Sequence, residues 1–146
     1  MRKMIVVADG LSASRTRDAA AKAIELYRQE PVEIHLLSVQ PRVSGDVSMF
    51  FGHGELHDLQ HDAGMEDTAP ARSLFDQATV PYQTVIRVGR SAETIAHYAH
   101  EQHCDRIVMG RQGDHESLAS RVFGNAAGQV RHILVADGDD CEVLGS

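Results

Sequence analysis

The stretch Ile107–Asn125, IVMGRQGDHESLASRVFGN, joins a short apolar run to two glycines three positions apart and to a third glycine beside an amide side chain. An apolar run of this length is typical of a buried strand, and the residues after it have the spacing of an amphipathic helix. The glycines admit two interpretations. They could bring backbone NH groups close to a bound phosphate, or they could let the chain turn between a strand and a helix.

Short apolar runs alternate with longer segments of helical period along the whole chain. The first run, Met4 to Ala8, is apolar at every position, which is typical of a strand covered on both faces. Further strands are predicted at residues 32–39, 82–88, 106–109 and 133–136, and helices after Ser12 or Ser14, around 69–78, after Ser91 and from Leu118 to Val130. This order predicts an α/β fold: a five-stranded parallel sheet in the order 3-2-1-4-5, with helices on both faces.

The 146 residues are predicted to form a single domain, residues 1–146, with two irregular regions. Residues from about 40 to 66 contain four glycines and many polar side chains, and we expect a long loop there. A loop of that length in a compact domain is usually functional or mobile. Residues 137–146, which include the letters DGDDCE, are predicted to be an acidic tail.

Composition narrows the class of protein. A net charge of −7 argues against a nucleic-acid partner, because such binding needs clustered Lys and Arg. The longest apolar runs are only a few residues, so we expect no membrane segment, and no leader is evident at the start of the chain. Cys104 and Cys141 have neither disulfide-framework nor metal-site spacing. We therefore expect a cytoplasmic protein with two reduced thiols.

Ligands of such a sheet bind beyond the carboxyl ends of its strands, where the strand order reverses. Three segments compete for that place: Asp9-Gly10, the residues after Val39, and Gly110 to Gly113. The loop at Gly110 directly follows a strand, and a helix after it would add positive charge at its N-terminus. The local pattern alone leaves a phosphate site and a plain strand-to-helix turn equally supported.

Four segments resemble the universal stress protein family. They are MIVVADGLSAS at 4–14, VEIHLLSVQP at 32–41, VIRVGRSAETIAHYAHEQHCDRIVMGRQG at 85–113 and SRVFGNAAGQVRH at 120–132. The resemblance covers essentially the whole chain. It implies a Rossmann-like fold of the adenine nucleotide alpha hydrolase type, paired into homodimers through the last strand. It also implies a stress-response or regulatory role.

The nucleotide-binding branch of that family carries Gly-x2-Gly-x9-Gly-Ser/Thr, which wraps a triphosphate and ribose. The resemblance therefore implies ATP or another adenine nucleotide as the ligand, with Mg²⁺ as an accompanying ion. The residues to which it assigns binding are Asp9, Val39, Gly110, Arg111, Gly113, Gly124 and Asn125. We expect the last two at the start of the final helix, close to the phosphates.

This chain departs from the family pattern at three places. Ten residues, not nine, separate Gly113 from Gly124, and Asn125 stands where a Ser or Thr hydroxyl is expected. Asp114 and Glu116 bring negative charge to the loop, which Arg111, Arg121 or a divalent cation would have to offset. No proline spacer precedes the strand at 133–136, so we expect that strand to be short or displaced.

His53, His57 and His61 recur at a spacing of four residues. On a helix, two of them could hold a divalent metal on one face, as in zinc sites. A solvated polar segment without metal is the preferred interpretation, since Gly52 and Gly54 disfavour a helix.

Two functions remain open on the sequence. The first is a regulatory protein that binds an adenine nucleotide; no residue is evidently placed as a catalytic base, so ATP hydrolysis would at most be slow. The second is a dimeric interaction protein of the same family that binds no nucleotide.

Overall fold

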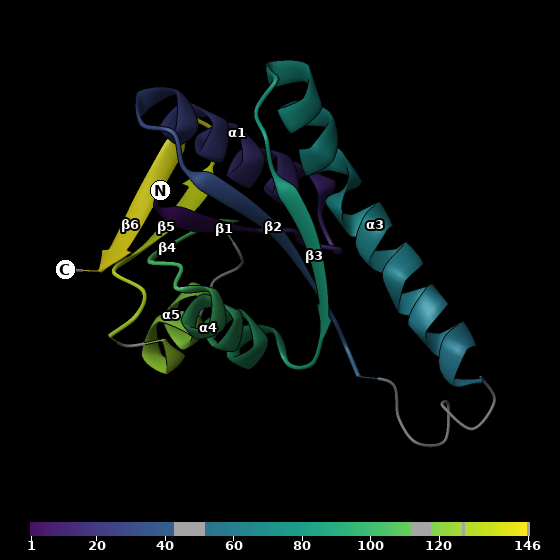
Figure 1. Ribbon diagram of the computed structural model, residues 1–146. Helices are drawn as coiled ribbons and strands as arrows, with labels where there is room; N and C mark the ends of the chain where they lie inside the picture. Colours follow the sequence, from purple (N-terminus) through teal and green to yellow (C-terminus); the bar gives the residue numbers. More distant parts are fainter. Residues whose placement is uncertain (43–51, 112–117, 127, 146) are drawn as a thin grey trace.

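A computed structural model describes residues 1–42, 52–111, 118–126 and 128–145 (Figure 1). These residues form a six-stranded sheet in the order β3-β2-β1-β4-β5-β6. The strands are β1 Lys3–Val7, β2 Glu33–Gln40, β3 Gln83–Val88, β4 Arg106–Gly110, β5 His132–Asp137 and β6 Asp140–Gly145. The first five are parallel and have the predicted order 3-2-1-4-5, which confirms the predicted fold class. The sixth strand is antiparallel and was not predicted.

Helices cover both faces of the sheet (Figure 1). They are α1 Ala13–Gln29, α3 His53–Ala78, α4 Ser91–Gln102 and α5 Leu118–Asn125. Helices α1 and α3 pack on one face and α4 and α5 on the other. Within the described residues, no helix combines the length and the apolar character that a membrane span needs.

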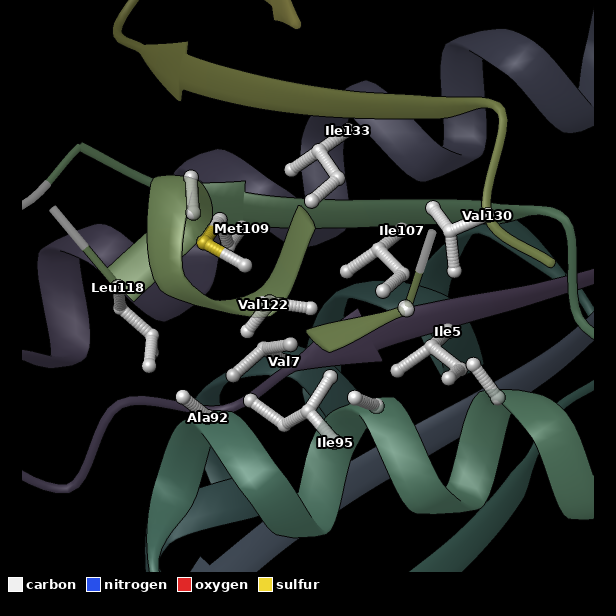
Figure 2. Close-up of a cluster of buried hydrophobic side chains, with 14 of the residues drawn as sticks. Ile5, Val7, Ala92, Ile95, Ile107, Met109, Leu118, Val122, Val130 and Ile133 are labelled. Carbon is white, nitrogen blue, oxygen red and sulfur yellow. The ribbon is translucent and has the colours of Figure 1, made fainter. Parts of the chain in front are cut away.

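The central strand β1 explains the continuous apolar run at the start of the chain. Met4 and Val6 pack among residues of α1 and α3, whereas Ile5 and Val7 pack among residues of α4 and α5 (Figure 2). All four side chains are buried because successive residues of a strand point to opposite faces. A strand covered on both faces is therefore apolar at successive positions.

Helix α3 corrects the predicted loop from residue 53 to 66 and the short helix at 69–78, whereas residues 43–51 of that loop lie outside the described residues. It starts at His53 and runs without interruption to Ala78. Its first turns reach beyond the sheet, and no described side chain from Gly54 to Ala63 is buried (Figure 1). A helix that buries nothing shows no apolar period, so the sequence pattern missed it. Gly64 then lets the helix approach β3, since a Cβ there would lie 2.7 Å from the Ile86 side chain.

The predicted acidic tail is also corrected, because most of it is β6. Residues Gly138 and Asp139 form a two-residue turn between β5 and β6, with Gly138 at a φ of 60°. A Gly-Asp pair between two strands is a known hairpin signal. Arg111 holds the hairpin through Asp137 at 3.3 Å and Glu142 at 2.9 Å. Within this hairpin, β6 pairs with β5 along the whole length of β5.

The expectation of a short or displaced last parallel strand is wrong. Strand β5 pairs with β4 from Arg106↔His132 to Gly110↔Ala136. The missing proline spacer is replaced by a compact turn, in which Val130 NH donates to the Ala126 carbonyl and Arg131 NH to the Asp105 carbonyl. The outer edge of β5, through which the resemblance implied pairing into homodimers, is paired with β6.

A polar group lies within the core between β2, β3 and α4. His35 is 1% exposed, and its Nε2 lies 2.8 Å from a Glu33 carboxylate oxygen. Its Nδ1 contacts the Tyr98 hydroxyl and lies 2.9 Å from Gln83 Nε2. A ring that donates from Nε2 to the carboxylate and accepts at Nδ1 from the Tyr98 hydroxyl satisfies both of its nitrogens.

This network predicts a pH dependence of stability. The hydrogen bond from His35 lowers the pKa of Glu33 below its ordinary value of 4.5, mainly because it favours the ionised carboxylate. The stabilisation is therefore present above pH 4.5 and is lost as the pH falls through the folded-state pKa. Urea unfolding of wild type and Glu33→Gln should show a larger difference in unfolding free energy at pH 7 than at pH 3. An equal difference at both pH values would contradict this.

Candidate functional site

Two adjoining cavities lie beyond the carboxyl ends of the strands. The inner cavity, of about 440 Å³, is lined by Val7, Ala8, Asp9, Gly10, Leu11, Val39, Gln40, Pro41, Asp67, Ser91, Ile95, Leu118 and Arg121. The outer cavity, of about 1090 Å³, lies between the chain after β2, the start of α4 and the end of α5. The two share Val39, Pro41, Ser91 and Arg121. They lie beside β1, on whose two sides the chain winds in opposite directions, which is where such sheets bind ligands.

Asp9 lies at the inner cavity, as the sequence predicted. Its side chain is 10% exposed and forms an ion pair with Arg15 at 3.0 Å. Its other carboxylate oxygen accepts a hydrogen bond from the Leu11 NH at 2.8 Å, and Thr16 Oγ1 lies 2.8 Å from the Asp9 NH. These contacts fix the turn between β1 and α1. The carboxylate is thus held in one orientation, with its charge offset by Arg15.

Val39 also lies at the inner cavity, and its backbone direction follows from the strand ladder. The Leu37 carbonyl accepts from the Ala8 NH on the β1 side, whereas the Gln40 carbonyl accepts from the Gly89 NH on the β3 side. Backbone groups of a parallel strand alternate between its neighbours. Val39 therefore directs its NH and carbonyl to the β1 side, beyond the end of β1, where the inner cavity begins.

Sequence reasoning missed two further polar residues of the inner cavity. The Gln40 amide donates to an Asp67 carboxylate oxygen at 2.7 Å and lies 2.9 Å from Ser38 Oγ. Asp67 comes from α3, in a helix whose extent was not predicted. No motif marks it; only the tertiary approach of α3 to the end of β2 brings it here.

The outer cavity is rich in arginine. Arg42, Arg90 and Arg121 line it, together with the first residue of α4, Ser91. Glu93 is the acidic side chain in its lining, and it lies 3.8 Å from Arg90. The amino end of α4 adds partial positive charge from its unpaired NH groups. The lining is therefore net cationic, although the whole chain is acidic.

Gly124 and Asn125 line the outer cavity but stand at the wrong end of a helix for the role expected of them. Helix α5 ends at Asn125, so these residues lie at its carboxyl end, where the helix dipole is negative. The chain reaches β5 only seven residues later and has no room for the longer final helix that was predicted. A phosphate beside Gly124 and Asn125 would therefore gain nothing from the amino end of α5.

Gly110 and Arg111 line neither cavity. A Cβ on Gly110 would lie 2.6 Å from both the Cβ and the carbonyl oxygen of Arg15, so this glycine lets α1 pack against the end of β4. Arg111 is directed to the C-terminal hairpin instead. For Gly110 the structure thus supports the turn interpretation. Gly113, Asp114 and Glu116 lie outside the described residues.

The histidines on α3 give no metal centre in the part of the chain that the structure describes. His57 and His61 are exposed on the projecting half of the helix. No group of three His, Cys, Asp or Glu side chains suited to a metal ion occurs among the described residues. The side chain of His53 is not among them.

The two glycines in the loop pattern should respond oppositely to alanine. Gly110→Ala should lower the free energy of unfolding by about 1–3 kcal/mol, because the new methyl group overlaps the backbone of Arg15. Gly124→Ala should raise it by up to about 1 kcal/mol, since nothing lies within 4 Å of the new methyl group and alanine favours a helix. Urea unfolding of both variants measures the change in the free energy of unfolding. A Gly110→Ala protein as stable as wild type would overturn the packing role of Gly110.

Comparisons with known proteins agree with the fold. The chain is similar to the universal stress protein UspA from Lactobacillus plantarum, with 18% identity, 93% of this chain and 97% of that chain covered, and a TM-score of 0.71. It is also similar to a universal stress protein family protein from Arabidopsis thaliana with AMP bound, with 14% identity, 95% of this chain and 94% of that chain covered, and a TM-score of 0.66. A third similar structure is the universal stress protein from Archaeoglobus fulgidus in complex with dAMP, with 17% identity, 94% of this chain and 98% of that chain covered, and a TM-score of 0.60.

At these identities the solved structures show the fold alone. No curated protein sequence matches the chain. The model of the universal stress protein family, however, matches residues 1–136, which is nearly the whole chain. The chain therefore belongs to the universal stress protein family.

Proposed function

We propose that this protein binds an adenine nucleotide across the inner and outer cavities and acts as a cytoplasmic stress-response regulator. One observation carries the binding proposal. The inner cavity offers apolar side chains and backbone hydrogen-bonding groups, and the adjoining outer cavity offers arginines. A ligand with a flat polar ring at one end and phosphate at the other matches this division.

The nucleoside would occupy the inner cavity. Val7, Ile95 and Leu118 supply apolar surface in its lining. The Val39 NH and carbonyl, directed beyond the end of β1, form a donor and acceptor pair that suits the edge of adenine. Asp9, held by Arg15, lies at the same cavity and would accept a hydrogen bond from the nucleoside.

The phosphate would lie in the outer cavity. Arginine side chains bind phosphate through charge-assisted, often bidentate hydrogen bonds. Arg121 lines both cavities, so it lies where the nucleoside and phosphate parts of the ligand would meet. Where ATP is the ligand, Mg²⁺ would accompany its phosphates and offset charge that the three arginines leave. The AMP and dAMP bound by two structurally similar proteins support the choice of an adenine nucleotide.

The described groups favour binding over catalysis. Asp9 is engaged by Arg15 and by the Leu11 NH, Asp67 by the Gln40 amide, and Glu93 lies within 4 Å of Arg90. None of these three carboxylates is evidently aligned to activate a water against a terminal phosphate. We therefore propose a sensor that binds a nucleotide, with ATP hydrolysis at most slow.

Calorimetric titration tests the proposal with AMP and with ATP, each with and without Mg²⁺. Wild type should bind, and Arg121→Ala should bind about tenfold more weakly, because one charge-assisted hydrogen bond to phosphate is lost. Arg28→Ala is the matched control: Arg28 is exposed in the last turn of α1, outside both cavities. Absence of heat and of any thermal shift up to millimolar nucleotide would refute nucleotide binding.

A homodimeric interaction protein is the second candidate, favoured by the outer edge of β3. This strand is the outermost strand on its side of the sheet, and Val88 at its end is 42% exposed. Leu59, on the projecting part of α3, is 50% exposed. Open strand edges with apolar side chains suit pairing with another chain.

Sedimentation or native mass spectrometry at micromolar concentration distinguishes the candidates. A dimer that Val88→Lys dissociates, in a protein that binds no nucleotide, would support the interaction role. A monomer at all concentrations would contradict it.

A further inference from the structure

The inner cavity has one wall made of hydrogen-bond acceptors, formed by Gln40 and Asp67. Gln40 is 8% exposed, and its Nε2 lies 2.7 Å from Asp67 Oδ2 and 2.9 Å from Ser38 Oγ. An ionised carboxylate only accepts hydrogen bonds, so the amide NH₂ must face Asp67. The remaining polar atom of the amide is then its carbonyl oxygen, also an acceptor.

The position of the Asp67 carboxylate is enforced by the packing of α3. A Cβ on Gly10 would lie 2.7–2.9 Å from three atoms of this carboxylate, so an alanine at position 10 would displace it. Gly64 allows the close approach of α3 to β3 one turn earlier. The carboxylate is thus built into the cavity and does not merely point towards it from a loop.

Asp67 differs from Asp9, the other carboxylate of the inner cavity. Asp9 is paired with the Arg15 guanidinium, whereas Asp67 contacts the neutral Gln40 amide within the described part of the chain. A carboxylate with a neutral partner retains its full charge and its remaining lone pairs for a donor that enters the cavity.

We propose that Asp67 and Gln40 determine which nucleotide this site accepts, by selecting a ligand that presents N–H or O–H donors to this wall. This inference rests on the proposed nucleotide binding. Two groups have that chemistry: the exocyclic amine of adenine and the 2′-hydroxyl of the ribose. A 6-oxo purine would instead turn its carbonyl oxygen towards a carboxylate, leaving both oxygens without a hydrogen and repelling each other.

Asp67→Asn is the decisive variant, since it keeps the shape and changes the chemistry. Its amide oxygen would accept from Gln40 and leave its NH₂ towards the ligand, so an acceptor becomes a donor. Loss of a negative charge would strengthen binding of every nucleotide monophosphate alike. The ratio of two dissociation constants removes this common effect.

Calorimetric titration with AMP, IMP and 2′-dAMP at one ionic strength gives these ratios. If Asp67 accepts from the exocyclic amine of adenine, the preference for AMP over IMP should be about tenfold smaller in Asp67→Asn than in wild type. A factor of about ten corresponds to one hydrogen bond. If Asp67 accepts from the ribose 2′-hydroxyl, the preference for AMP over 2′-dAMP should fall by about the same factor in Asp67→Ala, because a hydroxyl could still accept from the amide of Asp67→Asn.

Two further variants separate charge from position. Glu66→Gln removes the same charge from an exposed neighbour on α3 and should leave both ratios unchanged. Gly10→Ala keeps the charge but displaces the Asp67 carboxylate, and it should lower the same ratio as Asp67→Asn. Thermal unfolding of each variant confirms that it is folded.

The outcomes distinguish the two proposals. Wild type that binds AMP, with the AMP/IMP ratio unchanged in Asp67→Asn and the AMP/2′-dAMP ratio unchanged in Asp67→Ala, would overturn the role of this wall and leave nucleotide binding intact. Wild type that binds none of the three ligands would overturn both.

Discussion

Burial of β1 on both faces is the constraint on which the rest of the structure depends. Its side chains alternate between two apolar clusters, so each face of the sheet must be covered by helices. The strands on either side of β1 run parallel to it, and their carboxyl ends therefore meet at one edge. The turn after β1 and the end of β2 open the inner cavity at that edge. The site is thus a by-product of the way the core is covered.

The sequence predicts the elements that bury much apolar surface and misses those that bury little. Strands β1, β4 and β5 could be predicted directly, because burial from two sides leaves short continuous apolar runs such as Met4–Ala8. The first half of α3 could not, since it covers nothing and carries no apolar period. Strand β6 has no buried residue and is acidic, and the sequence signal for it was the Gly138–Asp139 turn, not its hydropathy.

The candidate site divides in the same way. Asp9 and Val39 lie where predicted, because the ends of adjacent parallel strands converge whatever the loops do. Gly110 looks the same in sequence whether a phosphate or a helix backbone comes close to it; only the approach of Arg15 decides. Asp67 could not be predicted at all: it lies 27 residues from Gln40 and joins it only through the placement of α3.

The C-terminal hairpin has a consequence for the behaviour of the protein at high concentration. A parallel sheet that ended at β5 would present a regular row of unpaired backbone groups, which is a template for aggregation. Strand β6 pairs with that edge and carries the carboxylates of Asp140 and Glu142, and the turn before it carries Asp139. Like charges on an outermost strand repel a second copy of the same strand. On this side the sheet therefore ends in an acidic strand, whose charge disfavours edge-to-edge pairing with a second copy of itself.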